Sequence, residues 1–269
     1  MNRNLRGAAF AAAPFLFGSV AHAQWSSAFT SPRNAVVDAN GARVVQVEAS
    51  AGSLRVEGKA GVRQVQVRGT ARSSSQDVLK DIKLIAERRG DVVFIKADLP
   101  DYDRRSWTDT YSAGLDLVIE IPQGLAADIA DGSGEADVIN VGALEITDGS
   151  GELTINGAAS VRVTDGSGDV TIANIRGDVR VSDGSGDINV SNISGSFTVK
   201  SDGSGSISAS DVRGSVLVEN DGSGGIEATK IGRNFTVESK GSGSIRYREV
   251  SGQVDIPERH RERNRDEYR

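Results

Sequence analysis

The sequence predicts an all-β protein, a parallel β-solenoid (β-helix) in which each rung of 17 to 19 residues contributes two short strands. The tetrapeptide Asp-Gly-Ser-Gly recurs six times, a seventh copy has Lys in place of Asp, and the spacings are 17, 17, 18, 19, 19 and 19 residues. Between the copies lie two runs of alternating apolar and polar residues, separated by Gly, Asn and Asp. A short, nearly fixed period is typical of stacked repeats, and period-two alternation is typical of strands with one buried face.

Each rung contains two apolar pairs whose members stand two residues apart. One pair follows each Asp-Gly-Ser-Gly motif: Leu153/Ile155, Val170/Ile172, Ile188/Val190, Ile207/Ala209 and Ile226/Ala228. The other pair precedes the next motif: Leu144/Ile146, Val161/Val163, Val179/Val181, Phe197/Val199, Val216/Val218 and Phe235/Val237. Extra residues in the longer rungs, such as Lys200 and Glu219, fall at the corners. We therefore expect a buried face that fixes the strands, and corners that tolerate changes in length.

An antiparallel meander is the alternative arrangement of these strands. It would leave one apolar face uncovered, because the sequence offers no amphipathic helix to cover it, and a closed barrel of about fourteen strands would have a lumen too wide for Val and Ile to fill. In a solenoid, the two strands of a rung point their apolar side chains at each other, and each strand pairs with its equivalent in the next rung. We therefore expect a solenoid with rungs about 4.8 Å apart, and assume a right-handed coil.

The regular repeats occupy residues 125–256. The preceding region, 34–124, is expected to be an irregular part of the same solenoid that caps its end. Within that region we expect, in chain order, irregular rungs at 44–47, 54–56 and 65–67, a short helix at 75–81, a hairpin of 82–87 with 92–96, and a polar loop at 99–113.

The two ends of the chain are expected to lie outside the fold. Residues 1–23 have the features of a cleavable signal peptide: two arginines, a short apolar stretch, and Ala21-His22-Ala23 before the cleavage site. The apolar stretch is shorter than the roughly 20 residues that a transmembrane helix needs. Residues 24–33 are expected to form a linker, and 257–269, where Arg and Glu alternate, a disordered tail. Export to the periplasm, the cell surface or the medium follows.

Composition excludes several classes of function. Without Arg3 and Arg6 of the signal segment, 29 basic residues face 37 acidic ones, and an acidic protein repels nucleic acid and anionic lipid. The chain has no Cys, which excludes disulfides and thiolate metal sites. Its two His are His22, in the signal segment, and His260, in the tail. We therefore expect no catalytic residues, no bound organic cofactor and no nucleic-acid partner.

The motif aspartates are the most distinctive candidate site: Asp131, Asp148, Asp165, Asp183, Asp202 and Asp221. In stacked turns these carboxylates lie about 4.8 Å apart. Neighbouring charges then repel by about 0.9 kcal/mol in water and about 3.5 kcal/mol at an effective dielectric constant of 20. We favour a solvated row, in which each carboxylate accepts N–H bonds from its own turn and faces water. Calcium bound between rungs is the alternative, since oxygen ligands from stacked turns suit it.

Other polar positions also repeat from rung to rung. Asn140, Asn174 and Asn192, at the second corner, are expected to form a short row of hydrogen-bonded side chains. Solvent-facing strand positions should form flat faces: Arg162, Arg180, Thr198, Thr171, Asn189 and Ser208. Such faces favour a non-enzymatic module that binds a protein or polysaccharide of the cell envelope or surface.

A carbohydrate-active β-helix, a polysaccharide hydrolase or lyase, is the alternative function. Such an enzyme needs a pair of carboxylates in a cleft with room for a sugar chain. The repeats contain only three aromatic residues, Phe197, Phe235 and Tyr247, and their corners, about four residues long, leave no room for a pocket. Only the 99–113 loop combines Trp, Tyr, Arg and Asp, so a ligand site would lie there. We therefore expect a protein that is not an enzyme.

The chain also resembles a known family. It has a leading region in which Val and Gln alternate, then Pro122-Gln123-Gly124, and then repeats that contain Gly168-Asp169-Val170 and Gly186-Asp187-Ile188. Over residues 35–256 these features resemble the bacterial putative-adhesin family, which is built on an exported β-solenoid domain of unknown function. The resemblance implies an exported solenoid without established enzymatic activity, and it carries no catalytic residues over to this chain.

Overall fold

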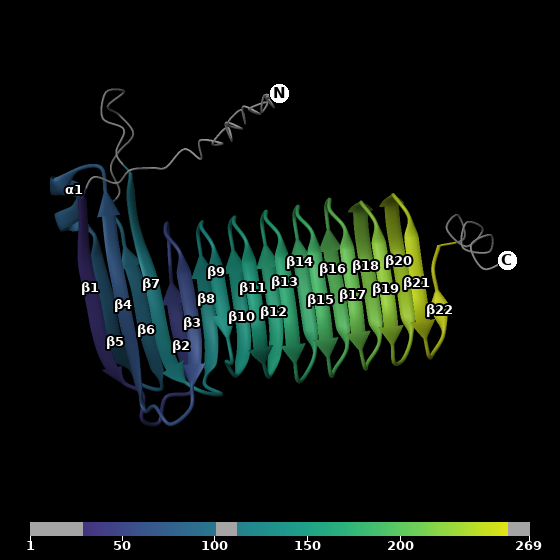
Figure 1. Cartoon of the computed structure of the whole chain (residues 1–269), viewed down its shortest axis with the longest axis horizontal. Coiled ribbons are helices and arrows are strands. Elements are labelled where there is room, and N and C mark those ends of the chain that lie inside the picture. The colour runs from purple at the N-terminus through teal and green to yellow at the C-terminus, as the bar shows by residue number, and fades with distance from the viewer. Residues whose placement is uncertain (1–28, 101–111, 258–269) are drawn as a thin grey trace, which may run out of the picture.

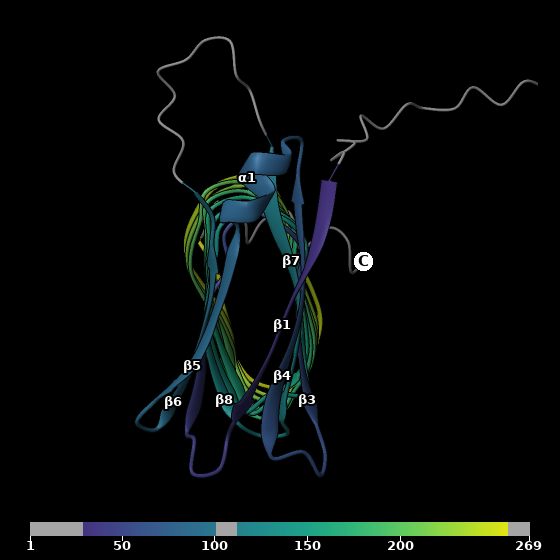
Figure 2. The same cartoon turned by 90° about the vertical axis from the view of Figure 1, so that its left-hand side faces the viewer.

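The structure, a computed structural model, describes residues 29–100 and 112–257. Two 11-stranded sheets face each other along the whole length of an elongated molecule (Figure 1). Seen along the long axis, the two sheets enclose a flattened tube (Figure 2). The sheet that contains β1 is called sheet A, and the sheet that contains β22 is called sheet B.

The regular repeats form the parallel solenoid that the sequence predicts. Successive strands alternate between the two sheets, and each strand pairs in parallel with the strand one rung further on. Sheet B takes β8 (Ala126–Asp131), β10 (Ala143–Asp148), β12 (Ser160–Asp165), β14 (Val179–Asp183), β16 (Phe197–Asp202), β18 (Val216–Ser223), β20 (Phe235–Ser242) and β22 (Val254–Asp255). Sheet A takes β9 (Ala136–Ile139), β11 (Leu153–Ala158), β13 (Val170–Ile175), β15 (Ile188–Ile193), β17 (Ile207–Val212), β19 (Ile226–Ile231) and β21 (Ile245–Val250).

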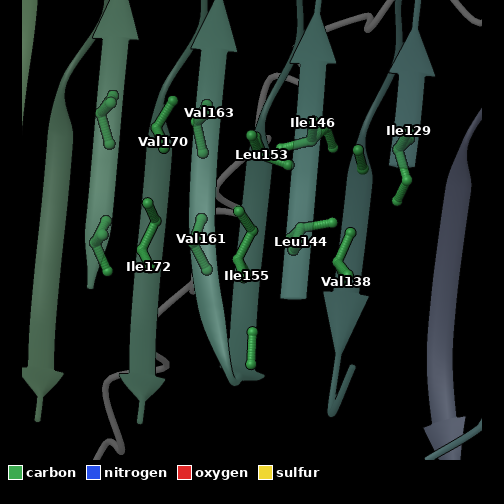
Figure 3. Close-up of a cluster of buried hydrophobic side chains, with 14 of the residues drawn as sticks. Ile129, Val138, Leu144, Ile146, Leu153, Ile155, Val161, Val163, Val170 and Ile172 are labelled. Atoms are coloured by element: carbon green, nitrogen blue, oxygen red, sulfur yellow. The ribbon is translucent and has the colours of Figure 1, made fainter. Parts of the chain in front are cut away.

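The core lies between the two sheets. Equivalent apolar residues of successive rungs pair directly, for example Val161 with Val179 and Ile155 with Ile172, and all four are at most 3% exposed. Figure 3 shows such side chains on neighbouring strands from β8 to β13. The second corner adds a further buried row, which the alternating pairs did not reveal: Ile175, Ile193, Val212 and Ile231. Each rung therefore buries aliphatic side chains from two strands and one corner.

The N-terminal part is built in a different strand order. Its elements are β1 (Phe29–Asp38), β2 (Val44–Glu48), β3 (Leu54–Lys59), β4 (Gln64–Ser73), α1 (Gln76–Asp81), β5 (Lys83–Arg89), β6 (Val92–Asp98) and β7 (Ala113–Pro122). The helix and the β5–β6 hairpin are as predicted. β2 and β3 form a parallel rung, also as predicted, but this rung lies between β6/β7 and β8/β9, so the chain inserts an early rung next to a later one.

Two expectations about this part are corrected. Residues 65–67 do not form a rung of the coil: they belong to β4, which pairs antiparallel with both β1 and β7. Residues 29–33 are not a linker, because β1 begins at Phe29. Arg33 of β1 donates hydrogen bonds to the carbonyl oxygens of Leu79 and Ile82 at 2.9 and 2.8 Å, which joins α1 and its C-terminal end to the outermost strand of sheet A.

Several sequence expectations fall outside the described residues: the signal peptide, most of the 99–113 loop and the charged tail after residue 257. At the C-terminal end of sheet B, β22 pairs with β20, and Ile256 after it is 4% exposed. Within 29–100 and 112–257, no helix is both long and apolar enough to span a bilayer.

The second corner holds one residue per rung in the left-handed region. This residue is Asn at three rungs, but φ is also positive at Asp211 (54°), Lys230 (57°) and Glu249 (54°). Gly157 has the same conformation one rung from Asn174 (φ 79° and 61°). A left-handed conformation costs a side chain such as Lys about 1–2 kcal/mol, whereas Gly adopts it freely.

Replacing Lys230 with Gly is therefore expected to stabilise the fold by about 0.5–1 kcal/mol, measured by chemical denaturation. The substitution removes only an exposed 3.6 Å ion pair with Asp211, which contributes little. Thr229→Gly is the matched control and should destabilise the fold, because Thr229 lies in a strand without a positive φ. A Lys230→Gly variant as unstable as the control would contradict the prediction.

Candidate functional site

The six motif aspartates point into the solenoid. Each is the third inward residue of its sheet B strand, so that Val161, Val163 and Asp165 share one buried face of β12. Strand pairing places the six in register, from Asp131 to Asp221, and Lys240 occupies the seventh position. The six carboxylates are called the aspartate file: Asp131, Asp148, Asp165, Asp183, Asp202 and Asp221. All six and Lys240 are between 1% and 7% exposed.

The prediction that the aspartates face water is therefore wrong. The signal that shows their position is the period-two alternation itself, which continues one step beyond the apolar pair and places the Asp on the buried side. In the longer rungs, the extra residue Lys200 shifts the register between Val181 and Ser182. This bulge keeps Asp202 opposite Asp183 and so keeps it inside.

Glycine lets the turns stack directly on one another. Gly168 has φ +135°, and a Cβ there would overlap the carbonyl oxygen of Gly151 in the preceding turn. Its N–H donates to the carbonyl oxygen of Ser185 in the next turn at 2.9 Å. The same pattern repeats at the last Gly of the other motifs, so any side chain at this position would force the turns apart.

The carboxylates of the file have few hydrogen-bond donors. Asp131 accepts a bond from the N–H of Gly132 at 2.9 Å, and Asp183 accepts one from the N–H of Ser185 at 3.2 Å. Both carboxylate oxygens of Asp148, Asp165 and Asp202 are buried without a hydrogen bond of ordinary geometry. Because an unpaired buried polar group is costly, this row is the least satisfied part of the fold.

Burial also changes the acidity of the file. Desolvation, together with a smaller effect of neighbouring carboxylates, raises the pKa of Asp131, Asp165, Asp183 and Asp202 to about 6. Desolvation likewise raises the pKa of Asp148 above its ordinary value. Backbone N–H groups of the turns act in the opposite direction but do not outweigh burial. The file therefore favours states in which its negative charge is neutralised.

Lys240 ends the file with a buried positive charge. Its Nζ lies 2.5 Å from Oδ2 of Asp221 and donates to the carbonyl oxygens of Gly224 at 2.7 Å and Ser242 at 2.8 Å. Neither side chain of this ion pair is exposed. At the other end of the file, Ala49 precedes Asp131 in register, because Glu48 pairs with Ala130. The file is therefore closed by an apolar residue on one side and an ammonium group on the other.

A second row of carboxylates lies outside the same corner. Its members are exposed and follow the turns directly: Glu135, Glu152, Asp169 and Asp187. Oδ1 of Asp169 accepts a bond from the N–H of Asp187 at 3.0 Å, and Oδ1 of Asp187 accepts one from the N–H of Ser206 at 2.8 Å. All four carboxylates therefore have the solvent that the aspartate file lacks, and Asp169 and Asp187 also have hydrogen-bond donors.

The outer faces have the positions that the sequence predicts. Thr171, Asn189 and Ser208 pair in register on the outer face of sheet A. Arg162, Arg180 and Thr198 do so on sheet B. All six alternate with buried neighbours along their strands.

The predicted asparagine row is confirmed in part. Asn192 donates its amide to Oδ1 of Asn174 at 2.5 Å. The next partner of Asn174 is Asn156, at 2.8 Å, rather than Asn140. Gly157 accounts for the difference, because it pairs in the rung between Asn140 and Asn174 and has no side chain.

A shallow groove of about 530 Å³ lies beside the second corner, between Asn192 and Glu249, and Asp211 and Lys230 line it. Within residues 29–100 and 112–257, no three His, Asp or Glu side chains converge as ligands of one metal ion. The chemistry that this part of the chain offers is thus of two kinds: buried unneutralised carboxylates, and extended outer faces.

No protein-family model matches the chain, and no curated protein does. Solved structures similar to it include a "putative cell adhesion protein" from Clostridium sporogenes, with 12% identity over 85% of this chain and 99% of that one, and a TM-score of 0.31. A "putative adhesin" and a "putative lipid binding protein" from Parabacteroides distasonis each show 11% identity over 84% of this chain and 97% of the other, with TM-scores of 0.35 and 0.38. The adhesin names agree with the family that the sequence resembles. Because the identities and TM-scores are low, these structures support no statement about what this chain binds.

Proposed function

We propose that the protein is an exported, non-enzymatic β-solenoid that acts as an adhesin-like or envelope-associated binding module, in the periplasm or at the cell surface. The observation that supports this most is the outer face of sheet A. Between the two corners, strands β11, β13, β15 and β17 present in-register outward residues without charge, and the exposed Asp211 of β17 lies at the second corner: Thr154, Asn156, Thr171, Ala173, Asn189, Ser191, Ser208 and Ser210 form this set. These residues are called the neutral face.

The neutral face is bordered by charged residues that pair with one another. On one side Asp137 binds Arg55 at 2.9 Å, and on the other Glu227 binds Arg248 at 3.2 Å. Sheet B differs, since its equivalent outward positions include Glu145, Arg162 and Arg180. Hydroxyl and amide groups about 4.8 Å apart on a rigid sheet suit repeated hydrogen bonds to a polar polymer or an extended polar protein surface.

The partner that we propose is a polysaccharide or protein of the envelope or cell surface. The alternative, a polysaccharide hydrolase or lyase with its site at the 99–113 loop, has no support in the described residues, because 101–111 lie outside them. Incubation with a polysaccharide panel separates the two functions. New reducing ends or unsaturated products would replace the binding proposal with the enzymatic one.

The test of the neutral face is a charge introduced on one sheet at a time. Thr171→Arg with Ser208→Arg places two charges on the neutral face. Thr164→Arg with Ser182→Arg places the same two charges on the outer face of sheet B. We expect the first variant to bind isolated envelopes or their purified polysaccharides at least tenfold more weakly in sedimentation assays, and the second to bind like the parent protein. Equal affinity of both variants would exclude the neutral face.

A further inference from the structure

The aspartate file contains more negative charge than the fold neutralises. Six buried carboxylates stand in register, and within the described residues the only buried cationic side chain in contact with them is that of Lys240. Neighbouring carboxylates about 4.8 Å apart repel each other more strongly in the interior than in water. Nine carboxylate oxygens of the file are buried and receive no hydrogen bond of ordinary geometry, although backbone N–H groups of the turns approach some of them. Unpartnered buried oxygens in such numbers indicate that a positively charged ligand belongs among them.

Lys240 shows independently where a cation fits. It stands at the Asp position of the seventh motif, and its ammonium group is held by a carboxylate and a Gly carbonyl of the preceding turn and by a Ser carbonyl of its own turn. All three oxygens lie 2.5–2.8 Å from Nζ. The ammonium group of Lys240 therefore occupies a cation position between two successive turns, those of Asp221 and of Lys240 itself.

The earlier turns repeat the same set of oxygens without the lysine. Around the turn of Asp202, the equivalent atoms are a carboxylate oxygen of Asp183 and the carbonyl oxygens of Gly186 and Ser204. In the described structure, no backbone N–H donates to the carbonyl of Gly186 or to that of Gly205, and at Gly224 this acceptor receives the Lys240 ammonium. Each pair of successive turns thus offers two carboxylates and two backbone carbonyl oxygens. Among the described residues, the Gly carbonyl oxygen of each set accepts no backbone N–H.

We propose that the aspartate file binds calcium ions inside the solenoid, between successive turns, at the positions equivalent to that of the Lys240 ammonium group. Calcium accepts carboxylate and carbonyl oxygens at 2.3–2.6 Å in flexible geometry, whereas magnesium demands a small, nearly octahedral shell and retains water. After Lys240 neutralises Asp221, five carboxylates remain. Two calcium ions compensate four of these charges, so we expect at least two ions per chain. This inference does not depend on the proposed binding partner.

The experiment compares thermal unfolding of the purified protein in chelator, CaCl2 and MgCl2 at equal ionic strength. At pH 7.5, saturating calcium is expected to raise Tm by about 10 °C, estimated for two sites at a hundred times their Kd. Magnesium should raise Tm much less. Isothermal titration calorimetry should give at least two ions per chain.

Two double variants locate the site. Asp165→Asn with Asp183→Asn removes two central carboxylates of the file and should abolish most of the Tm response. Asp169→Asn with Asp187→Asn removes the same charge from the exposed row of the same turns and should retain the response. Equal Tm values in calcium and chelator at pH 7.5 would overturn the proposal. So would a response that is lost only in the exposed-row variant. If the first variant does not fold, an anomalous-scattering peak in the file of a calcium-grown crystal decides the question, and a file without such a peak overturns the proposal.

Discussion

Replacing Lys240 with Met is expected to lower the free energy of unfolding by about 3–5 kcal/mol. The substitution keeps the length and most of the volume of the side chain but removes the ammonium group that Asp221, Gly224 and Ser242 share. Asp221 then stays buried without its counter-charge, next to Asp202. Breaking one side of a buried ion pair is costly because the other charge has no water to return to. Chemical denaturation at pH 7.5 measures the effect.

Lys200→Met is the matched control. Lys200 of β16 pairs with Glu219 of the neighbouring sheet B strand β18, but its side chain is 52% exposed. Surface pairs contribute between 0 and about 1 kcal/mol, so this variant should be close to the parent protein. Adding Asp221→Asn to Lys240→Met removes the orphaned charge and should restore part of the loss. Equal losses in the Lys200 and Lys240 variants would show that the buried pair has no special role.

The second large effect is a loss of folding stability as the pH rises from about 5 to 7.5. Asp131, Asp165, Asp183 and Asp202 have a folded-state pKa of about 6, against 3.8 in the unfolded chain. The unfolded chain therefore loses these protons first as the pH rises. The contribution of these groups to stability is complete below about pH 4, declines between pH 4 and 6, and is lost above pH 6 to 7. For one isolated group, a folded-state pKa of about 6 against 3.8 in the unfolded chain corresponds to about 3 kcal/mol.

Because the four groups interact, their protons leave in coupled steps, and the total loss is smaller than four independent groups would give. In chelator we expect maximal stability near pH 4.5 to 5 and a fall of several kcal/mol by pH 7.5. Ordinary ion pairs limit stability on the acid side: the hydrogen bond from Lys59 lowers the pKa of Glu57, and its contribution is lost as the pH falls through that lowered value.

Urea unfolding across pH 4 to 8 measures this profile. Asp165→Asn with Asp183→Asn should flatten it, since an amide fills the same space and does not titrate. Asp169→Asn with Asp187→Asn changes the same net charge on the exposed row and should change the slope much less, because these two carboxylates are only the smallest causes of the raised pKa of Asp183 and Asp202. A parent protein that gains stability from pH 5 to 7.5 in chelator would contradict the raised pKa values.

Much of the fold could be predicted from the sequence because the repeats encode it locally. Pairs such as Val161/Val163 identify the buried side of each strand. The extra residue Lys200, which the sequence places at a corner, lies instead within β16, where it is exposed in a bulge. The outward positions of the neutral face, Thr171, Asn189 and Ser208, follow from the same alternation. Each of these inferences needs only neighbouring residues and the geometry of a strand.

The N-terminal part could not be predicted in this way. The 44–47 and 65–67 runs alternate alike, yet the first belongs to a parallel rung and the second to antiparallel β4. Alternation shows which side of a strand is buried, but the pairing partner depends on contacts with residues far away in the chain. Insertion of the β2–β3 rung between β6/β7 and β8/β9 is such a long-range choice.

The sequence alone thus determined the repeat, the two strands per rung, and the side of the sheet on which each side chain stands. Alternation points the motif aspartates inward, but only the tertiary structure decided that they are enclosed rather than solvated, because that depends on where the turns close over the interior. A carboxylate beside Gly-Ser-Gly resembles a solvated turn residue until the two sheets are placed face to face. The stacked glycine turns then enclose it, and the unneutralised charge becomes the central chemical feature of the protein.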